Sequence, residues 1–507
     1  MTRPTPHAAR PSPQSPVPQS PVPLPPTLDV AIIGAGFSGL GMAIGLDRAG
    51  WRDWVILERG DEVGGTWRDN RYPGCACDVQ SHLYSFSFAL EPDWSRSYSP
   101  QPEILAYLQR VAREHGLRDR VRFRADVRQA RWDPDRKHWS IQTAAGVVHA
   151  RMLVMASGAL SDPVIPSLPG LERFAGTTFH SARWNHDVPL AGKRVAVIGT
   201  GASAIQFVPI IQRQVARLHL FQRTPAWIMP QPNHRVPRAA RWLYRHVPGT
   251  QRAVRGLVYA GREAMVLGFR HPRLMRRVQR VAERHLARQV PDAALRRKLT
   301  PGYTLGCKRI LLSNDFYPAI QQPNVELVTT GIASIGARAI VDGDGVGHGV
   351  DVIIFGTGFQ PTHPPLADHL RGREGETLAG RWARGLRAFA GTTVHGFPNF
   401  FVIPGPNTGL GHSSVVYMSE AQIAHVVAVM RLAQERGAAV VEPSADAEAR
   451  WMSEVDRRMR GTVWVEGGCR SWYLDETGRN STIWPDFTWR FRRRVARVDP
   501  GDYLLAT

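Results

Sequence analysis

Cysteine is scarce in this sequence, which has only Cys75, Cys77, Cys307 and Cys469 in 507 residues. Cys75 and Cys77 lie two residues apart, but no cluster of His or Cys supplies the other ligands of a zinc site, so no metal is expected. The sequence therefore predicts four free thiols in a reducing cytoplasm.

Long apolar runs are also missing. No stretch of 18 apolar residues occurs, which predicts that no helix crosses a membrane. The first residues lack the apolar core of a signal peptide, which favours a cytoplasmic location. Residues 1–27 contain ten prolines and almost no large apolar side chain. Because proline removes a backbone donor and fixes φ, this segment is predicted to be a disordered tail.

Acidic residues are few relative to basic ones: 43 against 64, a net charge of +21. Nearly all the basic residues are arginine. Such a balance favours contact with anions, namely nucleotide phosphates, nucleic acid or anionic lipid. No nucleic-acid-binding motif is present, so a nucleic-acid partner is not expected. The length is sufficient for two or three domains with large cores.

The first informative pattern is a glycine-rich turn between a strand and a helix. Residues 28–33 form a short apolar run that predicts a buried parallel strand, and Gly34, Gly36 and Gly39 follow at once. Glycines at this spacing let the backbone approach a pyrophosphate at a helix N-terminus. A second predicted strand ends at Glu58, 24 residues after Gly34, where a carboxylate accepts a hydrogen bond from a ribose hydroxyl. This combination predicts an FAD site.

The same pattern recurs in the middle of the chain. A predicted strand over residues 194–198 leads into Gly199, Gly201 and Ala204, and the next strand ends at Arg223, again 24 residues on. Arginine at the position of the ribose-binding acid accommodates a 2′-phosphate. The second site is therefore predicted to bind NADPH.

Between the two turns lies the stretch Phe174-Ala-Gly-Thr-Thr-Phe-His-Ser-Ala-Arg-Trp184. With the flanking turns it resembles the fingerprint F-x-G-x-x-x-H-x-x-x-W of the type I flavin-dependent Baeyer–Villiger monooxygenases. Phe174, Gly176, His180 and Trp184 match, whereas Asn185 departs from the usual Pro or Asp. Relatives that oxygenate nitrogen or sulfur tend to carry another aromatic residue in place of this Trp, so Trp184 favours ketone chemistry.

The resemblance covers residues 28–491 and implies an α/β fold with two Rossmann-like dinucleotide-binding domains, for FAD and NADP, and a helical insertion. Two further departures are Ala204 for the third glycine and Ser157 where Thr is common. The expected parts are a tail (1–27), the FAD-binding domain (28–165 and 361–507), the NADP-binding domain (166–232 and 305–360) and the insertion (233–304).

The resemblance also implies roles for individual residues. Arg309, in the context Gly306-Cys-Lys-Arg309, corresponds to the family's catalytic arginine, and Asp78 to a carboxylate beside the flavin that holds it. His180 and Trp184 are expected to couple NADP binding to domain closure rather than to take part in bond chemistry. The remaining expected cofactor-binding residues are Gly65, Thr66, Trp67 and Tyr84 for the flavin, and Ser203, Gln206, Thr224 and Trp472 for NADP.

The predicted insertion is strongly basic. Thirteen arginines lie between Arg238 and Arg288, against only Glu263 and Glu283. The family commonly has a helical insertion here that caps the active site, and this is the role we expect. A basic amphipathic helix can also lie on an anionic membrane, so peripheral membrane contact through residues 238–288 is the alternative.

The predicted reaction uses NADPH to reduce FAD, after which O2 adds to give a flavin C4a-peroxide that attacks a ketone and yields an ester or lactone. Charge develops on oxygen in this chemistry, and Arg309 supplies the fixed cation that it needs. Two alternatives stay open: a monooxygenase that acts on an amine or a sulfide, and a non-catalytic flavoprotein that associates with membranes. The sequence specifies neither the ketone nor the oligomeric state.

Overall fold

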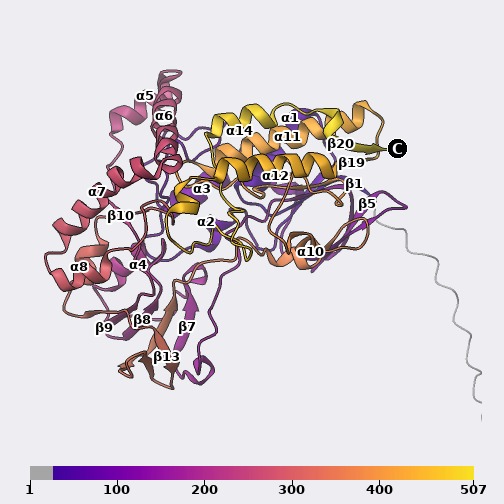
Figure 1. Cartoon of the computed structure of the whole chain (residues 1–507). Helices are drawn as coiled ribbons and strands as arrows, with labels where there is room; N and C mark the ends of the chain where they lie inside the picture. Colours follow the sequence, from indigo (N-terminus) through magenta and orange to yellow (C-terminus); the bar gives the residue numbers. More distant parts are fainter. Residues whose placement is uncertain (1–26) are drawn as a thin grey trace, which may run out of the picture.

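A computed structural model of the chain describes residues 27–507, so the predicted proline-rich tail lies, apart from Thr27, outside the described residues. Most strands belong to two sheets, which Figure 1 shows on opposite sides of the molecule. A group of helices projects beyond both sheets. This arrangement confirms the predicted α/β fold class.

The first sheet has eight strands in the order β17-β4-β5-β6-β1-β2-β3, with β18 paired to β6. Its centre is parallel, since β1 pairs in parallel with both β2 and β6. These central strands are apolar on both faces because helices and loops cover the sheet on both sides. The strands are β1 (Leu28–Ile33), β2 (Trp54–Leu57), β3 (Val121–Arg122), β4 (Val127–Asp133), β5 (His138–Thr143), β6 (Gly146–Met155), β17 (Leu370–Arg371) and β18 (Phe400–Val402).

The helices on one face of this sheet include α11, which packs against α1 and α14. Among the described residues, α11 is the one helix long and apolar enough to cross a membrane, but 61% of its apolar window is buried. Its apolar character is therefore explained by the core that it shares with α1. The helices of this part are α1 (Phe37–Ala49), α2 (Thr66–Asp69), α3 (Gln101–Glu114), α10 (Leu378–Trp382), α11 (Val415–Glu435), α12 (Ala445–Met459), α13 (Val463–Glu466) and α14 (Thr488–Val495).

The second sheet has five parallel strands in the order β12-β9-β8-β16-β7. The antiparallel strands β13 to β15 form a separate sheet whose buried residues share a core with it. The elements are β7 (Thr177–His180), β8 (Arg194–Ile198), α4 (Ala204–Ile211), β9 (Arg217–Phe221), α9 (Phe316–Ile320), β12 (Val325–Val328), β13 (Ile332–Ile335), β14 (Ala339–Asp342), β15 (Gly347–Gly349) and β16 (Val352–Phe355).

A polar network joins β15 to this sheet. Glu326 of β12 accepts a hydrogen bond from His219 of β9 at 2.9 Å, and Nδ1 of His348 on β15 lies 3.6 Å from the same carboxylate. Asp342 binds the other nitrogen of His348 at 3.1 Å. These contacts hold the three antiparallel strands against the sheet.

The helical insertion lies between β10 and β11, which pair with each other. Its helices α5 and α6 form the projection at the top of Figure 1, and α7 and α8 lie beside the second sheet. The elements of this region are β10 (Ile228–Met229), α5 (Arg238–His246), α6 (Thr250–Arg270), α7 (Pro272–Gln289), α8 (Ala293–Leu299) and β11 (Leu311–Leu312). Outside the insertion, β19 (Val440–Pro443) and β20 (Tyr503–Ala506) form a separate two-stranded sheet near the C-terminus. The expected domain boundaries all fall between elements, and we keep them as a proposal.

Candidate active site

The centre of the candidate site is an ion pair between two loops. Arg309 donates from Nε to Oδ2 of Asp78 at 2.7 Å and from Nη2 to Oδ1 at 2.6 Å. Asp78 follows α2, and Arg309 lies between α8 and β11, so the pair joins segments 231 residues apart. Two parallel bonds of this kind fix both the position and the plane of the guanidinium.

The electrostatics of the pair keep both groups charged. Burial alone would raise the pKa of Asp78, but the charge and hydrogen bonds of Arg309 hold it below its usual value. The carboxylate in turn raises the pKa of Arg309. The arginine side chain is 31% exposed, so the cation is partly desolvated yet still open on one side.

Two side chains next to this pair were not predicted from the sequence. Arg262 of α6 donates to Gln80 at 2.6 Å, and its charge helps to lower the pKa of Asp78. Tyr473 lies beside Arg309, and its side chain is buried. Burial raises the pKa of Tyr473 to about 12, so the phenol stays protonated and can donate a hydrogen bond. Neither residue belongs to a local pattern that could have indicated it.

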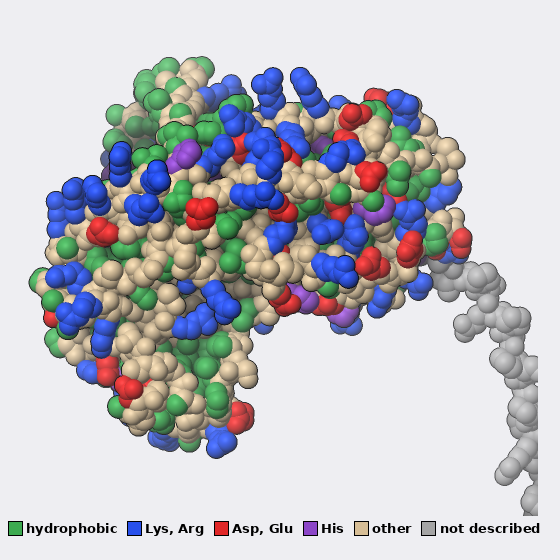
Figure 2. Space-filling view, in the orientation of Figure 1, with side chains coloured by type: hydrophobic (Ala, Val, Ile, Leu, Met, Phe, Trp, Pro, Cys, Tyr) green, Lys and Arg blue, Asp and Glu red, His purple; other side chains and the backbone are tan. Residues whose placement is uncertain are grey.

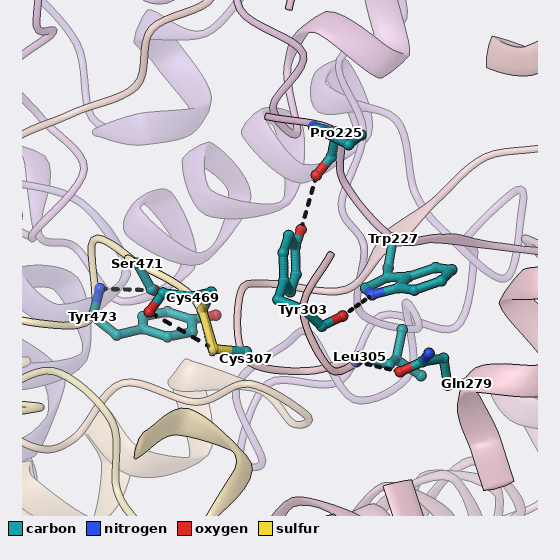
Figure 3. Close-up of a disulfide and its surroundings, with 9 residues drawn as sticks. All are labelled: Pro225, Trp227, Gln279, Tyr303, Leu305, Cys307, Cys469, Ser471 and Tyr473. Carbon is teal, nitrogen blue, oxygen red and sulfur yellow. Dashed lines mark hydrogen bonds between the residues drawn. A yellow bond between two sulfur atoms is a disulfide. The ribbon is translucent and has the colours of Figure 1, made fainter. Parts of the chain in front are cut away.

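A disulfide lies two residues from Arg309. Cys307 is bonded to Cys469, with the two Cα atoms 6.1 Å apart (Figure 3). The prediction of four free thiols is therefore wrong for these two cysteines, whereas Cys75 and Cys77 are free and buried. The sequence could not indicate the bond, because its partners are 162 residues apart and share no spacing pattern. The bond ties the loop of Arg309 to the segment that carries Trp472 and Tyr473.

The first glycine-rich turn has the geometry of a dinucleotide cradle. Gly34 has a left-handed backbone, with φ of +99°, and a Cβ there would lie 2.8 Å from the carbonyl oxygen of Ala156. The helix α1 begins three residues later, so its free N–H groups face the turn. Glu58 is 3% exposed and accepts from the backbone N–H groups of Ala35 and Gly60 and from Arg68. A carboxylate has about four acceptor positions, so one stays available for a ribose hydroxyl.

The remaining residues expected at the flavin lie close to this turn. Gly65 approaches Gly36, and a Cβ on Gly65 would lie 3.1 Å from the Cα of Gly36. Trp67 is buried and donates from its indole nitrogen to the hydroxyl of Tyr84 at 3.1 Å, so the two rings are fixed edge to face. Thr66 begins α2 and is exposed. These positions fit a flat ligand held between a backbone cradle and aromatic rings.

The second turn repeats the first. Gly199 has φ of +106°, and a Cβ there would lie 2.5 Å from the carbonyl oxygen of Gly356. Gly201 and Ser203 precede α4, which begins at Ala204. Gln206 has a second role that was not predicted: its side chain bonds Tyr72 at 3.0 Å and the backbone of Ala76, which joins α4 to the first domain.

Arg223 and Thr224 are exposed at the end of β9, as expected for a phosphate-binding position. In the part of the chain that the structure describes, no carboxylate pairs with Arg223. Burial and the charge of Arg223 together lower the pKa of Lys308, so the two cations lie near each other. Two adjacent cations fit a 2′-phosphate, and Lys308 was not predicted to take part.

The fingerprint residues mainly organise the crossing between the domains. Gly176 lies so close to the carbonyl oxygen of Asp351 that a Cβ would be 2.3 Å from it, and Phe174 packs in the core of the second sheet. His180 ends β7, and its Nδ1 accepts from Ala182 at 3.1 Å. Burial lowers the pKa of His180 to about 4, so the ring is neutral.

Trp184 is buried against Phe179 and against Phe207 of α4, with ring centroids 5.2 Å apart in both cases. It is therefore part of the core beside the NADP turn. Trp472 is 41% exposed, and its ring lies tilted against that of Tyr473 with the centroids 4.4 Å apart. Tyr473 rather than Trp472 lies next to Arg309.

Comparison with known proteins agrees with this geometry. A family profile described as pyridine nucleotide-disulphide oxidoreductase matches residues 31–237. A Baeyer–Villiger monooxygenase of Streptomyces coelicolor is 50% identical over 94% of this chain and 92% of its own length. A Baeyer–Villiger monooxygenase of Pseudomonas aeruginosa is 47% identical over 100% of this chain and 94% of its own length. The crystal structure of OTEMO in complex with FAD and NADP matches with a TM-score of 0.85 and 28% identity, covering 95% of this chain and 100% of that one.

The two cradles and the two sheets define a flavoprotein oxidoreductase with separate FAD and NADP sites. At the identity and coverage just given, the chain belongs to the Baeyer–Villiger monooxygenases.

Proposed function

We propose that Arg309 is the cation at the reacting centre of this monooxygenase, that Asp78 holds it, and that the substrate is a ketone, which is converted to an ester or lactone. The observation that carries the proposal is the two-bond contact between these residues in a partly open site. Tyr473, whose buried side chain lies beside Arg309, is a third group at the same place.

Bound NADPH supplies a hydride, and bound FAD accepts it and activates O2 for transfer to the substrate. Gly34, Gly36, Gly39 and Glu58 would hold FAD, and Gly199, Gly201 and Arg223 would hold NADPH. At the first glycine of each turn, Gly34 or Gly199, a Cβ would lie within 2.8 Å of a carbonyl oxygen, so both turns are as tight as a pyrophosphate-binding turn requires.

The work of Arg309 is electrostatic. When an oxygen nucleophile adds to a ketone, negative charge develops on the former carbonyl oxygen. A guanidinium has five N–H groups, and Asp78 uses two of them, so other N–H groups remain to donate to that oxygen. Because Asp78 fixes the plane of the guanidinium beforehand, little reorganisation accompanies the reaction.

The proposal can be tested by incubating the purified enzyme with NADPH and each of a panel of ketones, and by measuring the mass of the product. We expect NADPH oxidation to accelerate when a suitable ketone is added, and the product to be heavier than that ketone by one oxygen atom. Amines and sulfides serve as the comparison substrates. If only they are oxygenated, the ketone proposal is wrong and the amine- or sulfide-oxygenating alternative holds.

Two further expectations belong to this proposal. The cytoplasmic location stays a prediction. The helical insertion caps the site from one side, because Arg262 of α6 reaches the surroundings of Asp78.

A further inference from the structure

The helix α6 has two faces of opposite character. Its inner face is polar and bonded to the rest of the chain: Arg255 donates to the backbone of His82 at 2.9 Å, and Glu263 accepts from Thr488 at 2.8 Å. The buried Phe269 adds an apolar contact at its end. This face fastens the helix over the segment that follows Asp78.

The outer face of α6 is apolar and exposed to solvent. Its exposed side chains recur at spacings of four and three residues, so they form one stripe. The members are Ala253, Leu257, Ala260, Ala264 and Leu267. Leu257 is 75% exposed, and a methyl group added at Gly256 or Gly261 would meet no atom within 4 Å. At about 1.5 Å per residue the stripe is roughly 21 Å long.

The neighbouring helix α5 extends this apolar surface. Trp242 is 59% exposed, and Leu243 and Val247 are each 39% exposed. Figure 2 shows hydrophobic side chains gathered over α5 and α6 at the top of the molecule. We call the outer side of these two helices the α5–α6 face. Exposed clusters of this kind mark surfaces that contact a protein or a membrane.

The charge of the exposed side chains distinguishes a protein partner from a membrane. Arg238 and Arg252 are exposed on the same two helices, and α7 continues with Arg273, Arg277 and Arg280. The only acids between residues 238 and 288 are Glu263, which is buried on the inner face, and Glu283. A second copy of the chain would bring arginines against arginines, whereas a bilayer with anionic headgroups supplies the opposite charge.

We propose that the α5–α6 face docks the enzyme on an anionic membrane, with the stripe of α6 at the level of the headgroups. Trp242 and Leu257 enter the apolar layer, and the flanking arginines bind lipid phosphates. Since the inner face of α6 covers the surroundings of Asp78, the site then lies close to the lipid in which an apolar substrate dissolves. The docking itself does not depend on the proposed reaction.

The test is co-sedimentation of the FAD-loaded enzyme with vesicles of phosphatidylcholine, alone or mixed with phosphatidylglycerol. We expect binding only to the mixed vesicles, and weaker binding at about 1 M salt, where the Debye length falls to about 3 Å. The double variant Trp242→Glu/Leu257→Glu should bind at least about tenfold more weakly, because two apolar anchors are lost. Val346→Glu, at a 53% exposed valine between β14 and β15, is the matched control and should bind as the parent does.

Three results would overturn the proposal: no binding of the parent to mixed vesicles, equal binding of the double variant, or equal loss in Val346→Glu. A parent dimer in solution that the double variant converts to a monomer would assign the face to a second copy instead. Turnover of a water-soluble ketone serves as the check on folding and should be the same in all three proteins, so that failure of docking is separate from failure of the reaction.

Discussion

The two dinucleotide-binding domains share one local design but carry residues of opposite charge at one corresponding position. In both, a left-handed glycine follows the first strand, and the residue at the end of the second strand lies 24 positions later. In the first domain that residue is Glu58, buried and held by three donors. In the second it is Arg223, exposed and beside Lys308. We propose that this difference matches an unphosphorylated ribose at the first site and a 2′-phosphorylated ribose at the second.

The largest effect should follow from removal of the buried carboxylate. Glu58→Ala deletes the ribose acceptor and removes one of the two carboxylate partners of Arg68, whose side chain is 15% exposed and which keeps Asp69. The buried backbone N–H of Ala35 also loses its acceptor, and a buried donor left without a partner costs about 1–3 kcal/mol. We expect purified Glu58→Ala to lack FAD by its visible absorbance and to unfold at a lower temperature. Glu62→Ala removes a nearby, more exposed partner of Arg118 and should cost no more than about 1 kcal/mol. Equal FAD content in Glu58→Ala and the parent would contradict the role of Glu58.

The disulfide connects the two domains under comparison, because it links the loop beside the second glycine-rich turn to the C-terminal part of the first domain. Cys307→Ser/Cys469→Ser should lower the free energy of unfolding by about 2–4 kcal/mol. It should also raise the KM for NADPH, since Lys308 and Tyr473 flank the bond. Thiol titration of the denatured parent should give two thiols before reduction and four after it. Four thiols before reduction would show that the bond is absent.

The two cations near the second turn, Arg223 and Lys308, should have the smallest effect, and this effect should appear with only one nucleotide. Arg223→Ala and Lys308→Ala should each raise the KM for NADPH about 10- to 100-fold, the loss expected for a charge-assisted contact of about 1.5–3 kcal/mol. NADH lacks the 2′-phosphate and is the internal control. A parent enzyme that uses both nucleotides equally well would contradict the assignment of Arg223.

Sequence patterns predict the parts of this molecule that are locally encoded. The two turns, their strands and the residues Glu58 and Arg223 follow from glycine spacing and apolar runs, because a strand, a turn and a helix are specified within about 30 residues. The contact of Arg309 with Asp78 was expected only through the resemblance to a family.

Contacts between distant segments were not predictable in this way. Tyr473, Lys308 and Arg262 reach the sites from loops and a helix whose own sequences carry no sign of it. The disulfide was missed for the same reason, and the general scarcity of cysteine pointed to free thiols instead. Nothing in the local sequence around Cys307 or Cys469 records that chain folding brings them together.

The measurement that tests the central claim most directly is the fate of NADPH and ketone in Arg309→Ala. If Arg309 stabilises the charge on the substrate oxygen, reduction of FAD by NADPH should proceed, whereas ester formation should fall on the order of 100-fold or more. NADPH would then be consumed with release of hydrogen peroxide. Arg309→Lys should recover little, because an ammonium cannot make the two-bond contact with Asp78. Lys308→Ala, one residue away, should still form ester at saturating NADPH. Ester formation by Arg309→Ala at nearly the parent rate would contradict the account.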